Sequence, residues 1–270
     1  RAFARICEHR GLAFVLTDQM LAASSLLPIE MWRAAAETGA GRQRAAREVE
    51  IVTLSSDGRP AATQAGIDLV PRCAVTAAGD FEVVYLPALW RNPRKQIAKH
   101  RALLPWLVAQ AARGTTIAAV GTGCCFLAEA GLLDGKAATT HWHYFERFAR
   151  DYPNVRLKRQ YFITQADRLY CAGSVNALAD VTVHLIEQFF GRDVASHVER
   201  NFSHEIRRPY DEYRYLEGDE LQHADEAILG VQWRMQRELA RPLRMAALAR
   251  EAGMSARTLD RRFHEATGLS

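Results

Sequence analysis

The sequence predicts a larger α/β domain, with a mostly parallel sheet covered by helices on both faces, followed by a small all-α helix-turn-helix domain. Three observations support this fold class. Short apolar stretches alternate with helical stretches through about residue 205, which is typical of a parallel sheet buried on both faces. The polar, aromatic stretch 206–220 interrupts this pattern, and two short helical patterns close the chain. We therefore expect an α/β domain over 1–205, a linker over 206–220 and a helical domain over 221–270.

The composition indicates a globular protein without a membrane anchor. Of the 270 residues, 49% are hydrophobic and 24% are charged. No apolar run reaches the roughly 18 residues of a membrane span, and no signal segment opens the chain. The number of cysteines, five, is odd, and no two of them form a CxxC pair. Both features favour reduced thiols in the cytoplasm over a disulfide framework. The chain starts at Arg1 rather than Met, so we expect a trimmed N-terminus.

Six stretches have the short, apolar character of buried strands. In chain order they are Leu12–Asp18, Glu48–Gly58, Asp80–Pro87, Thr116–Val120, Lys136–His141 and Arg168–Gly173. In open parallel sheets the ligand site lies at the carboxyl ends of the strands. Gly121, His141 and the loop after Leu86 all follow predicted strands. The sequence therefore predicts a crevice at this edge of the sheet.

Four further stretches have helical spacing. They are Leu26–Glu37, Asn92–Gly114, Asn176–Gly191 and Leu221–Leu239, the last with Ile228, Leu229, Trp233 and Met235 on or near one side. The second is expected in two pieces, because Pro105 cannot donate a backbone hydrogen bond. Gly114 and Gly191 are expected to end their helices.

The turn after Thr116–Val120 resembles the strand–turn–helix that presents the nucleophile in several hydrolytic α/β folds. The residue on this turn is Gly121, which has no side chain. Glycine tolerates the strained backbone of such an elbow best. The sequence therefore predicts an elbow without a reacting atom.

The last 30 residues predict a DNA-binding unit. Met245–Ala252 and Ala256–Ala266 have helical patterns, Gly253 lies between them, and Ser255 is a natural N-cap. Such a pair is a helix-turn-helix, whose second helix enters the major groove with its N-terminal residues toward the bases. The residues expected at the DNA are Ser255, Ala256, Arg257, Arg261 and His264. The alternative is a plain helical hairpin with a solvated basic face.

The C-terminal residues also resemble a known family of DNA-binding proteins. The stretch "LAREAGMSARTLDRRFHEATGLS" resembles the first helix-turn-helix of AraC-type regulators, over roughly residues 221–270. Such regulators usually contain two of these units. The chain ends at Ser270, where the second should begin, so we expect a partial DNA-binding domain with weak operator binding.

The first 200 residues resemble the ThiJ/PfpI superfamily, which has the flavodoxin-like, class I glutamine amidotransferase-like fold. The matching stretches are "IAAVGTG", "LAEAGLLDGKAATTHW" and "RLYCAGSVNALADVTVHLIEQFFG". The fusion with an AraC tail resembles the GlxA-type regulators. This resemblance implies a homodimeric, cytoplasmic transcription regulator that binds DNA, and whose amidase-like domain senses a small molecule.

Enzymes of this superfamily have a Cys on the elbow, a His after the next strand and often an acid near the first helix. The resemblance places these positions at Gly121, at His141 and near Ser24. Where these enzymes have the Pro-Gly-Gly that helps to form an oxyanion hole, the resemblance places Pro87–Leu89. We expect the bulky Leu89 to narrow the floor of the pocket. We therefore expect a catalytically inert domain. The pocket residues expected are Ser24, Ala88, Gly121, Thr122, His141 and Trp142.

Several residues near this pocket have two interpretations. Cys124 and Cys125, one helical turn after the elbow, are expected to pack in the core, with redox sensing as the alternative. His141 bonds either a ligand or a backbone carbonyl. Trp90 and Trp142 either line the pocket, where aromatic walls suit a cationic ligand, or pack elsewhere.

The sequence contains no obvious metal site. "HWH" (141–143) lacks a third ligand at a suitable spacing, so we expect neither a metal nor a cofactor.

Three functions remain open from the sequence. The first is a regulator whose inert domain binds an effector, such as an amine or amino-acid derivative. The second is a hydrolase or hydratase that uses Cys124, Cys125 or a His-activated water. The third treats the tail as a structural or dimer-modulating piece.

Overall fold

The computed structural model describes residues 11–42, 49–90, 92–202, 214–216, 225, 227–228, 231–232, 235 and 245–268. The chain divides into two compact units, Arg1–Glu217 and Gly218–Ser270. Within the described part of the chain, no helix is long and apolar enough to cross a lipid bilayer.

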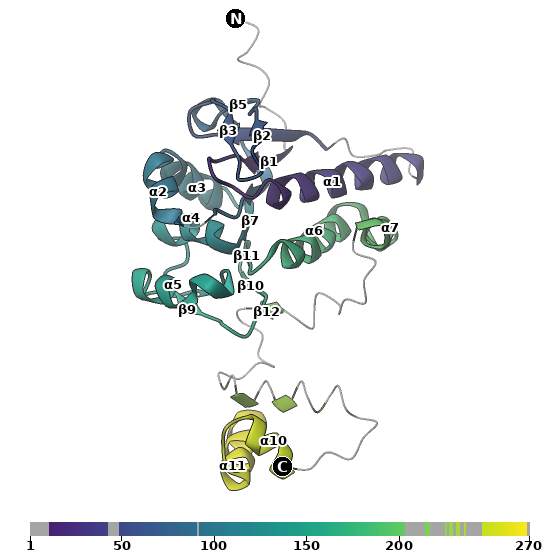
Figure 1. Ribbon diagram of the computed structural model, residues 1–270. Helices are drawn as coiled ribbons and strands as arrows, with labels where there is room; N and C mark the ends of the chain where they lie inside the picture. Colours follow the sequence, from purple (N-terminus) through teal and green to yellow (C-terminus); the bar gives the residue numbers. More distant parts are fainter. Residues whose placement is uncertain are drawn as a thin grey trace, which may run out of the picture. The chain divides into compact units, whose positions relative to one another are not determined.

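The first unit is built on an eight-stranded sheet with the order β12-β10-β11-β7-β6-β1-β2-β5 (Figure 1). The neighbouring strands are parallel, except for the antiparallel hairpin of β10 and β11. The strands are β1 (Gly11–Val15), β2 (Ile51–Ser55), β5 (Cys73–Ala74), β6 (Phe81–Leu86), β7 (Thr116–Val120), β10 (Ile163–Ala166), β11 (Leu169–Ala172) and β12 (Arg214–Leu216). Two small sheets pair β3 (Ala61–Ala62) with β4 (Asp68–Leu69), and β8 (Ala137–Ala138) with β9 (Arg156–Leu157).

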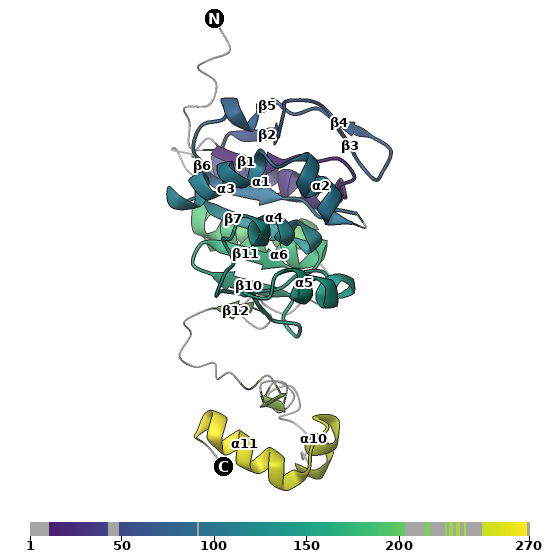
Figure 2. The same cartoon turned by 90° about the vertical axis from the view of Figure 1, so that its left-hand side faces the viewer.

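Helices cover both faces of this sheet (Figures 1 and 2). One layer consists of α1 (Ala23–Arg42), α6 (Val175–Phe190) and α7 (Arg192–Phe202), which pack against one another. The other consists of α2 (Pro93–Lys99), α3 (Leu103–Ala112), α4 (Cys124–Glu129) and α5 (Phe145–Asp151).

Each layer has its own hydrophobic core, because successive strand residues point to opposite faces. In β1, Ala13 and Val15 belong to one core cluster, and Leu12 and Phe14 belong to the other. The predicted α/β fold class with a C-terminal helical region is confirmed.

Three local predictions need correction. The helical stretch Asn92–Gly114 breaks at residues 100–102, before Pro105, which instead lies in the first turn of α3, where its missing N–H has no helical partner to lose. Of the predicted strand Lys136–His141, only Ala137–Ala138 forms a strand, and it pairs with β9. In the main sheet, the position beside β7 is occupied by β11 of the β10–β11 hairpin.

The region after Gly191 also differs from the prediction. The helix α7, which directly follows Gly191, was not predicted. Within the stretch expected to be a linker, Arg214–Leu216 forms β12 and pairs in parallel with β10. The main sheet therefore extends further along the chain than the alternating pattern indicated.

The second unit contains the expected helix pair, α10 (Met245–Glu251) and α11 (Ala256–Thr267). Gly253 has a φ of +66° in the turn between them. Its core consists of Ile228, Val231, Leu248, Ala249 and Leu259, with Met235 packed against it. Of the predicted helix Leu221–Leu239, Leu229 and Trp233 lie outside the described residues.

Candidate functional site

The elbow after β7 is made of two glycines with different constraints. Gly121 has a φ of +53°, in the left-handed region that favours glycine. A Cβ at this position would lie 3.6 Å from the Ala88 Cβ and 3.7 Å from the His141 Cβ, which are ordinary contact distances. A Cβ at Gly123 would lie 2.2 Å from the Pro87 carbonyl oxygen. Gly123 therefore allows a close backbone approach, whereas the space beside Gly121 is open.

A cavity of about 670 Å³ lies beside Gly121, within the size range of small-molecule sites. Its walls are mostly apolar. The lining residues are Leu21, Ala88, Leu89, Trp90, Asn92, Gly121, Thr122, His141, Trp142, His143, Tyr144 and Arg147. The structure thus brings together five of the six residues expected at the pocket, and Ser24 is the exception.

The hydroxyl of Ser24 lies behind the cavity wall instead. Its Oγ donates a hydrogen bond to the Leu21 carbonyl (2.6 Å) and accepts one from the Ala88 N–H (3.1 Å). On the other side of the loop, Thr122 Oγ1 accepts from the Leu89 N–H (3.0 Å) and donates to the Leu89 carbonyl (2.6 Å). Side chains of the protein therefore satisfy both N–H groups where the resemblance places an oxyanion hole.

His141 faces the cavity as a neutral ring. Burial lowers its pKa, and the neighbouring His143 lowers it further. Its Nδ1 accepts the His143 N–H at 3.4 Å, which favours the tautomer with the proton on Nε2. The preceding residue, Thr140, donates from Oγ1 to the Gly121 carbonyl (2.8 Å) and so connects this segment to the elbow.

The aromatic and charged residues of the cavity were only partly foreseen. Trp142 lines the cavity and is 69% exposed, so it does not pack in the core. The Arg147 guanidinium lies 5.9 Å from the ring centroid of Tyr144. Among the residues that the structure describes, no Asp or Glu lines the cavity. Sequence reasoning missed Arg147 and Tyr144, although both closely follow "HWH" in the chain.

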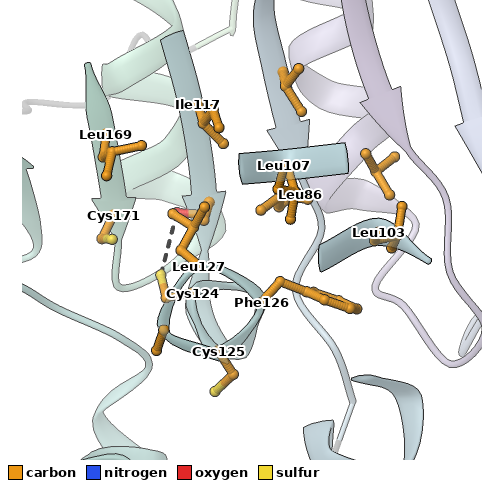
Figure 3. Close-up of a cluster of buried hydrophobic side chains, with 14 of the residues drawn as sticks. Leu86, Leu103, Leu107, Ile117, Cys124, Cys125, Phe126, Leu127, Leu169 and Cys171 are labelled. Atoms are coloured by element: carbon orange, nitrogen blue, oxygen red, sulfur yellow. Dashed lines mark hydrogen bonds between the residues drawn. The ribbon is translucent and has the colours of Figure 1, made fainter. Parts of the chain in front are cut away.

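The two cysteines after the elbow belong to the core (Figure 3). Cys124 and Cys125 are fully buried, and the Cys124 thiol lies 3.6 Å from the Ala119 carbonyl oxygen. Burial raises the pKa of both thiols, most strongly where Cys124 neighbours Cys171. These thiols are therefore protonated, and neither lines the cavity. Among the described residues, no cluster of three or more His, Cys, Asp or Glu side chains could hold a metal ion.

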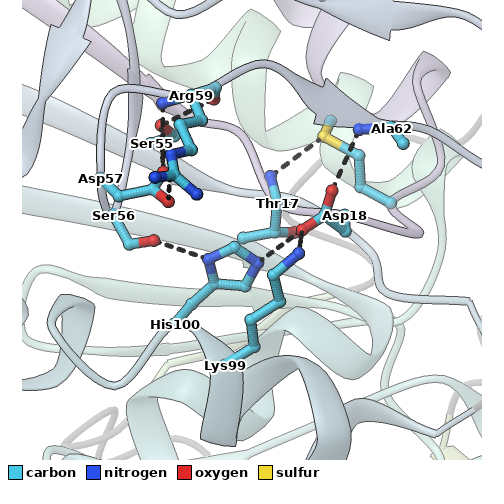
Figure 4. Close-up of polar contacts among 10 residues, drawn as sticks. Thr17, Asp18, Ser55, Ser56, Asp57, Arg59, Ala62, Lys99 and His100 are labelled. Atoms are coloured by element: carbon cyan, nitrogen blue, oxygen red, sulfur yellow. Dashed lines mark hydrogen bonds and ion pairs between the residues drawn. The ribbon is translucent and has the colours of Figure 1, made fainter.

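A second polar region lies beyond the carboxyl ends of β1 and β2 (Figure 4). Ser56 Oγ is 2.7 Å from His100 Nδ1, and His100 Nε2 is 3.4 Å from Asp18 Oδ2. Lys99 also pairs with Asp18. Because the His100 side chain is almost fully buried and contacts both Ser56 and Asp18, we interpret this arrangement as a closed structural connection between β1, β2 and α2.

Comparison with known proteins decides the family. The model of the DJ-1/PfpI family matches residues 14–188. The chain belongs to the DJ-1/PfpI family. Gly121 lies on the turn between β7 and α4, within the matched range.

Two of its relatives are regulators by name. It is 28% identical over 211 residues to the HTH-type transcriptional regulator CdhR of Pseudomonas aeruginosa, covering 78% of this chain and 62% of CdhR. It is 27% identical over 258 residues to the HTH-type transcriptional regulator GbdR of the same species, covering 95% of this chain and 68% of GbdR. The chain thus spans about two thirds of the length of these relatives.

A solved structure shares the fold. The crystal structure of an AraC family transcriptional regulator from Pseudomonas putida superposes with a TM-score of 0.61 at 21% identity, covering 72% of this chain and all of that one.

In the second unit of this DJ-1/PfpI member, α11 presents a basic face. Arg257, Arg261 and His264 are exposed, on the side of the helix opposite the buried Leu259. Ala256 is exposed as well, and Arg261 pairs with Glu265 (2.9 Å). Ser255 has a different role, since its Oγ caps the helix by accepting the Thr258 N–H (3.1 Å).

Proposed function

We propose that the chain is the ligand-sensing domain and part of the DNA-binding domain of a cytoplasmic, homodimeric transcription regulator. A small metabolite binds in the cavity beside Gly121 and controls operator binding by the helix-turn-helix. One observation carries this proposal: the family elbow opens onto a cavity of about 670 Å³ but has no nucleophile. The hydrogen bonds from Ala88 and Leu89 to side-chain hydroxyls support an inert site, because they leave no N–H of this pair for an oxyanion.

The lining favours an amino-acid derivative as effector. Trp90 and Trp142 offer aromatic faces to an ammonium group. Arg147 offers a guanidinium to a carboxylate. Because no acidic residue lines the cavity, a simple amine would lack a counter-charge there.

A short path of hydrogen bonds connects the cavity with the strand that precedes the second unit. Two residues before His141, the Thr139 N–H donates to Thr164 Oγ1 (3.0 Å). Thr164 lies in β10, where its register partner is Tyr215 of β12. β12 ends at Leu216, next to the boundary between the units. A ligand that prefers one position of His141 would thereby bias β12 and shift the population of DNA-binding arrangements.

Calorimetry with matched ligands tests the effector proposal. Amino acids and N-methylated amino acids would be compared with their amides and with the corresponding amines. We expect the acids to bind, and Arg147→Met to weaken them at least tenfold. Arg150→Met is the matched control, because both arginines lie close to Asp151 (3.7 Å for Arg147 and 3.6 Å for Arg150) but only Arg147 lines the cavity. Absence of any binder from a wide panel would contradict the proposal.

Thr164→Val tests the path. We expect unchanged ligand affinity and a loss of about 0.5–2 kcal/mol in the coupling between ligand and DNA binding. Thr182→Val, at another buried threonine, should leave this coupling intact.

The alternative is a hydrolase or hydratase that uses water activated by His141, and it is supported by the neutral ring in the cavity. Any turnover should then disappear in His141→Ala and survive in Cys124→Ala and Cys125→Ala.

A further inference from the structure

The second unit contains an ion pair that joins α11 to a distant part of the chain. Arg262 donates from Nε to Asp225 Oδ2 (2.7 Å) and from Nη2 to Asp225 Oδ1 (2.6 Å). Asp225 Oδ1 also accepts the N–H groups of Ala227 and Ile228, both at 3.2 Å. One carboxylate therefore caps a helical segment and holds the guanidinium of α11 in a bidentate geometry, which fixes orientation as well as distance.

The position of Arg262 on α11 gives this pair a directional effect. At 100° per residue, Arg262 lies about 60° from the buried Leu259 around the helix axis, whereas Arg257 and Arg261 lie on the opposite side. Leu259 and Ile228 share the core of the unit. The side chains of Arg262 and Asp225 are 36% and 20% exposed, so the pair lies at the edge of this core. A rotation of α11 about its axis would break the pair.

We propose that Asp225 is a positioning residue for DNA binding. Through Arg262 it holds α11 in the rotation that directs Arg257 and Arg261 away from the core and toward the groove. Arg262 is then a structural cation rather than a phosphate contact. The inference rests on the proposed DNA-binding function, and it gives an acidic residue a favourable role in binding a polyanion.

The direction in which Asp225→Ala changes DNA affinity distinguishes a positioning role from a purely electrostatic one. Duplexes would be enriched from a random library with the intact protein, and the enriched duplex would be compared with a scrambled one. Removing a negative charge near DNA should tighten binding on electrostatic grounds alone. We expect Asp225→Ala to weaken binding to the enriched duplex about tenfold, the size of a lost base contact. Binding to the scrambled duplex should change much less, whereas simple unfolding of the unit would weaken both equally.

Three further variants complete the test. Arg262→Ala should also weaken binding to the enriched duplex, but by less than Asp225→Ala, because Asp225 additionally accepts the N–H groups of Ala227 and Ile228. The double variant should lose no more than Asp225→Ala. Exchanging the charges with Asp225→Arg and Arg262→Asp should restore part of the specificity. A phosphate-contacting arginine would lower the salt slope by about one on removal, whereas Arg262→Ala should leave it unchanged.

The outcomes separate the two claims. Unchanged or tighter binding by Asp225→Ala, equal losses on both duplexes, or a lower salt slope for Arg262→Ala would overturn the inference while leaving DNA binding in place. Failure of the wild-type protein to enrich any duplex would overturn the proposed function itself.

Discussion

Two regions with candidate functional residues lie beyond the carboxyl ends of the parallel strands, and only one of them contains an open cavity. Beyond β6 and β7, Gly121 and His141 border a cavity of about 670 Å³. Beyond β1 and β2, Asp18, Ser56 and His100 contact one another directly. The second region has the more reactive set of side chains, but its histidine is buried. Reactive residue types alone therefore do not identify a binding site; the open volume beside them does.

The largest expected effect concerns the floor of the open region. Gly123→Ala would place a Cβ 2.2 Å from the Pro87 carbonyl oxygen, a backbone atom that cannot move away cheaply. We expect a loss of about 3 kcal/mol or more in the free energy of unfolding, in the range of severe backbone strain and overpacking. Gly121→Ala is the matched control. Its Cβ has space, so it should cost only about 1–2 kcal/mol for its left-handed backbone.

Denaturant unfolding of both variants measures this difference. Equal losses for the two glycines would mean that the close approach of Pro87 does not determine the elbow.

The closed region is expected to contribute stability rather than binding. Asp18 accepts hydrogen bonds from Lys99 and from the Ala62 N–H. Asp18→Asn removes the charge that Lys99 and His100 face, so we expect a loss of about 1–3 kcal/mol in the free energy of unfolding. Ligand affinity at the cavity should change little. If Asp18→Asn reduced the free energy of ligand binding by more than the free energy of unfolding, the two regions would be coupled through α2, whose N-cap Asn92 lines the cavity.

The pH dependence of stability should further distinguish the region around His100 from the cavity beside Gly121. Burial lowers the pKa of His100 below its ordinary value of 6.5, despite the nearby Asp18. The unfolded chain therefore binds a proton more readily, and stability falls as the pH drops below about 6.5 toward the lower folded value. The pKa of Asp18 is also lowered: burial alone would raise it, but the hydrogen bonds from Lys99 and Ala62 outweigh burial. Its contribution is lost only below about pH 4.

Thermal unfolding between pH 5 and 7.5 should thus show a decline that is smaller in His100→Gln. His141→Gln serves as the comparison, because His141 is more exposed and its pKa is lowered as well. A decline of unchanged size in His100→Gln would rule out this histidine as its source.

The sequence predicted the central framework well because its signals are local. The apolar run around Leu12–Val15 and the Gly-x-Gly turn at Gly121 are readable without knowledge of the fold. The hairpin between β10 and β11 was missed since its turn uses Asp167, with a φ of +54° and no adjacent glycine. The helix α7 was missed as well, and it buries only the small residues Val194, Ala195 and Val198.

The candidate site was predicted less completely, because its geometry depends on distant contacts. Ser24 was expected in the pocket, but its hydroxyl bonds the Ala88 N–H, 64 positions away. No periodicity reveals that Arg147 on α5 reaches the cavity. The pairing of Arg262 with Asp225, across 37 positions, was equally invisible. Sequence patterns locate strand ends, but they do not tell which polar groups there are already satisfied.

The smallest expected effect is the most informative about the open region. Gly121→Cys returns a thiol to the elbow, within reach of the neutral His141. We nevertheless expect no hydrolysis of p-nitrophenyl acetate or simple amides above the level of the wild-type protein. The reason is that Ser24 and Thr122 already occupy the N–H groups of Ala88 and Leu89, and loss of a single oxyanion donor costs about a hundredfold or more in rate.

Alkylation by iodoacetamide would verify that the new thiol is accessible. The double variant Gly121→Cys with Thr122→Val frees the Leu89 N–H and should show more turnover than Gly121→Cys alone. If Gly121→Cys alone hydrolyses the ester, the site has lost only its nucleophile, and its hydrogen bonds do not keep it inert.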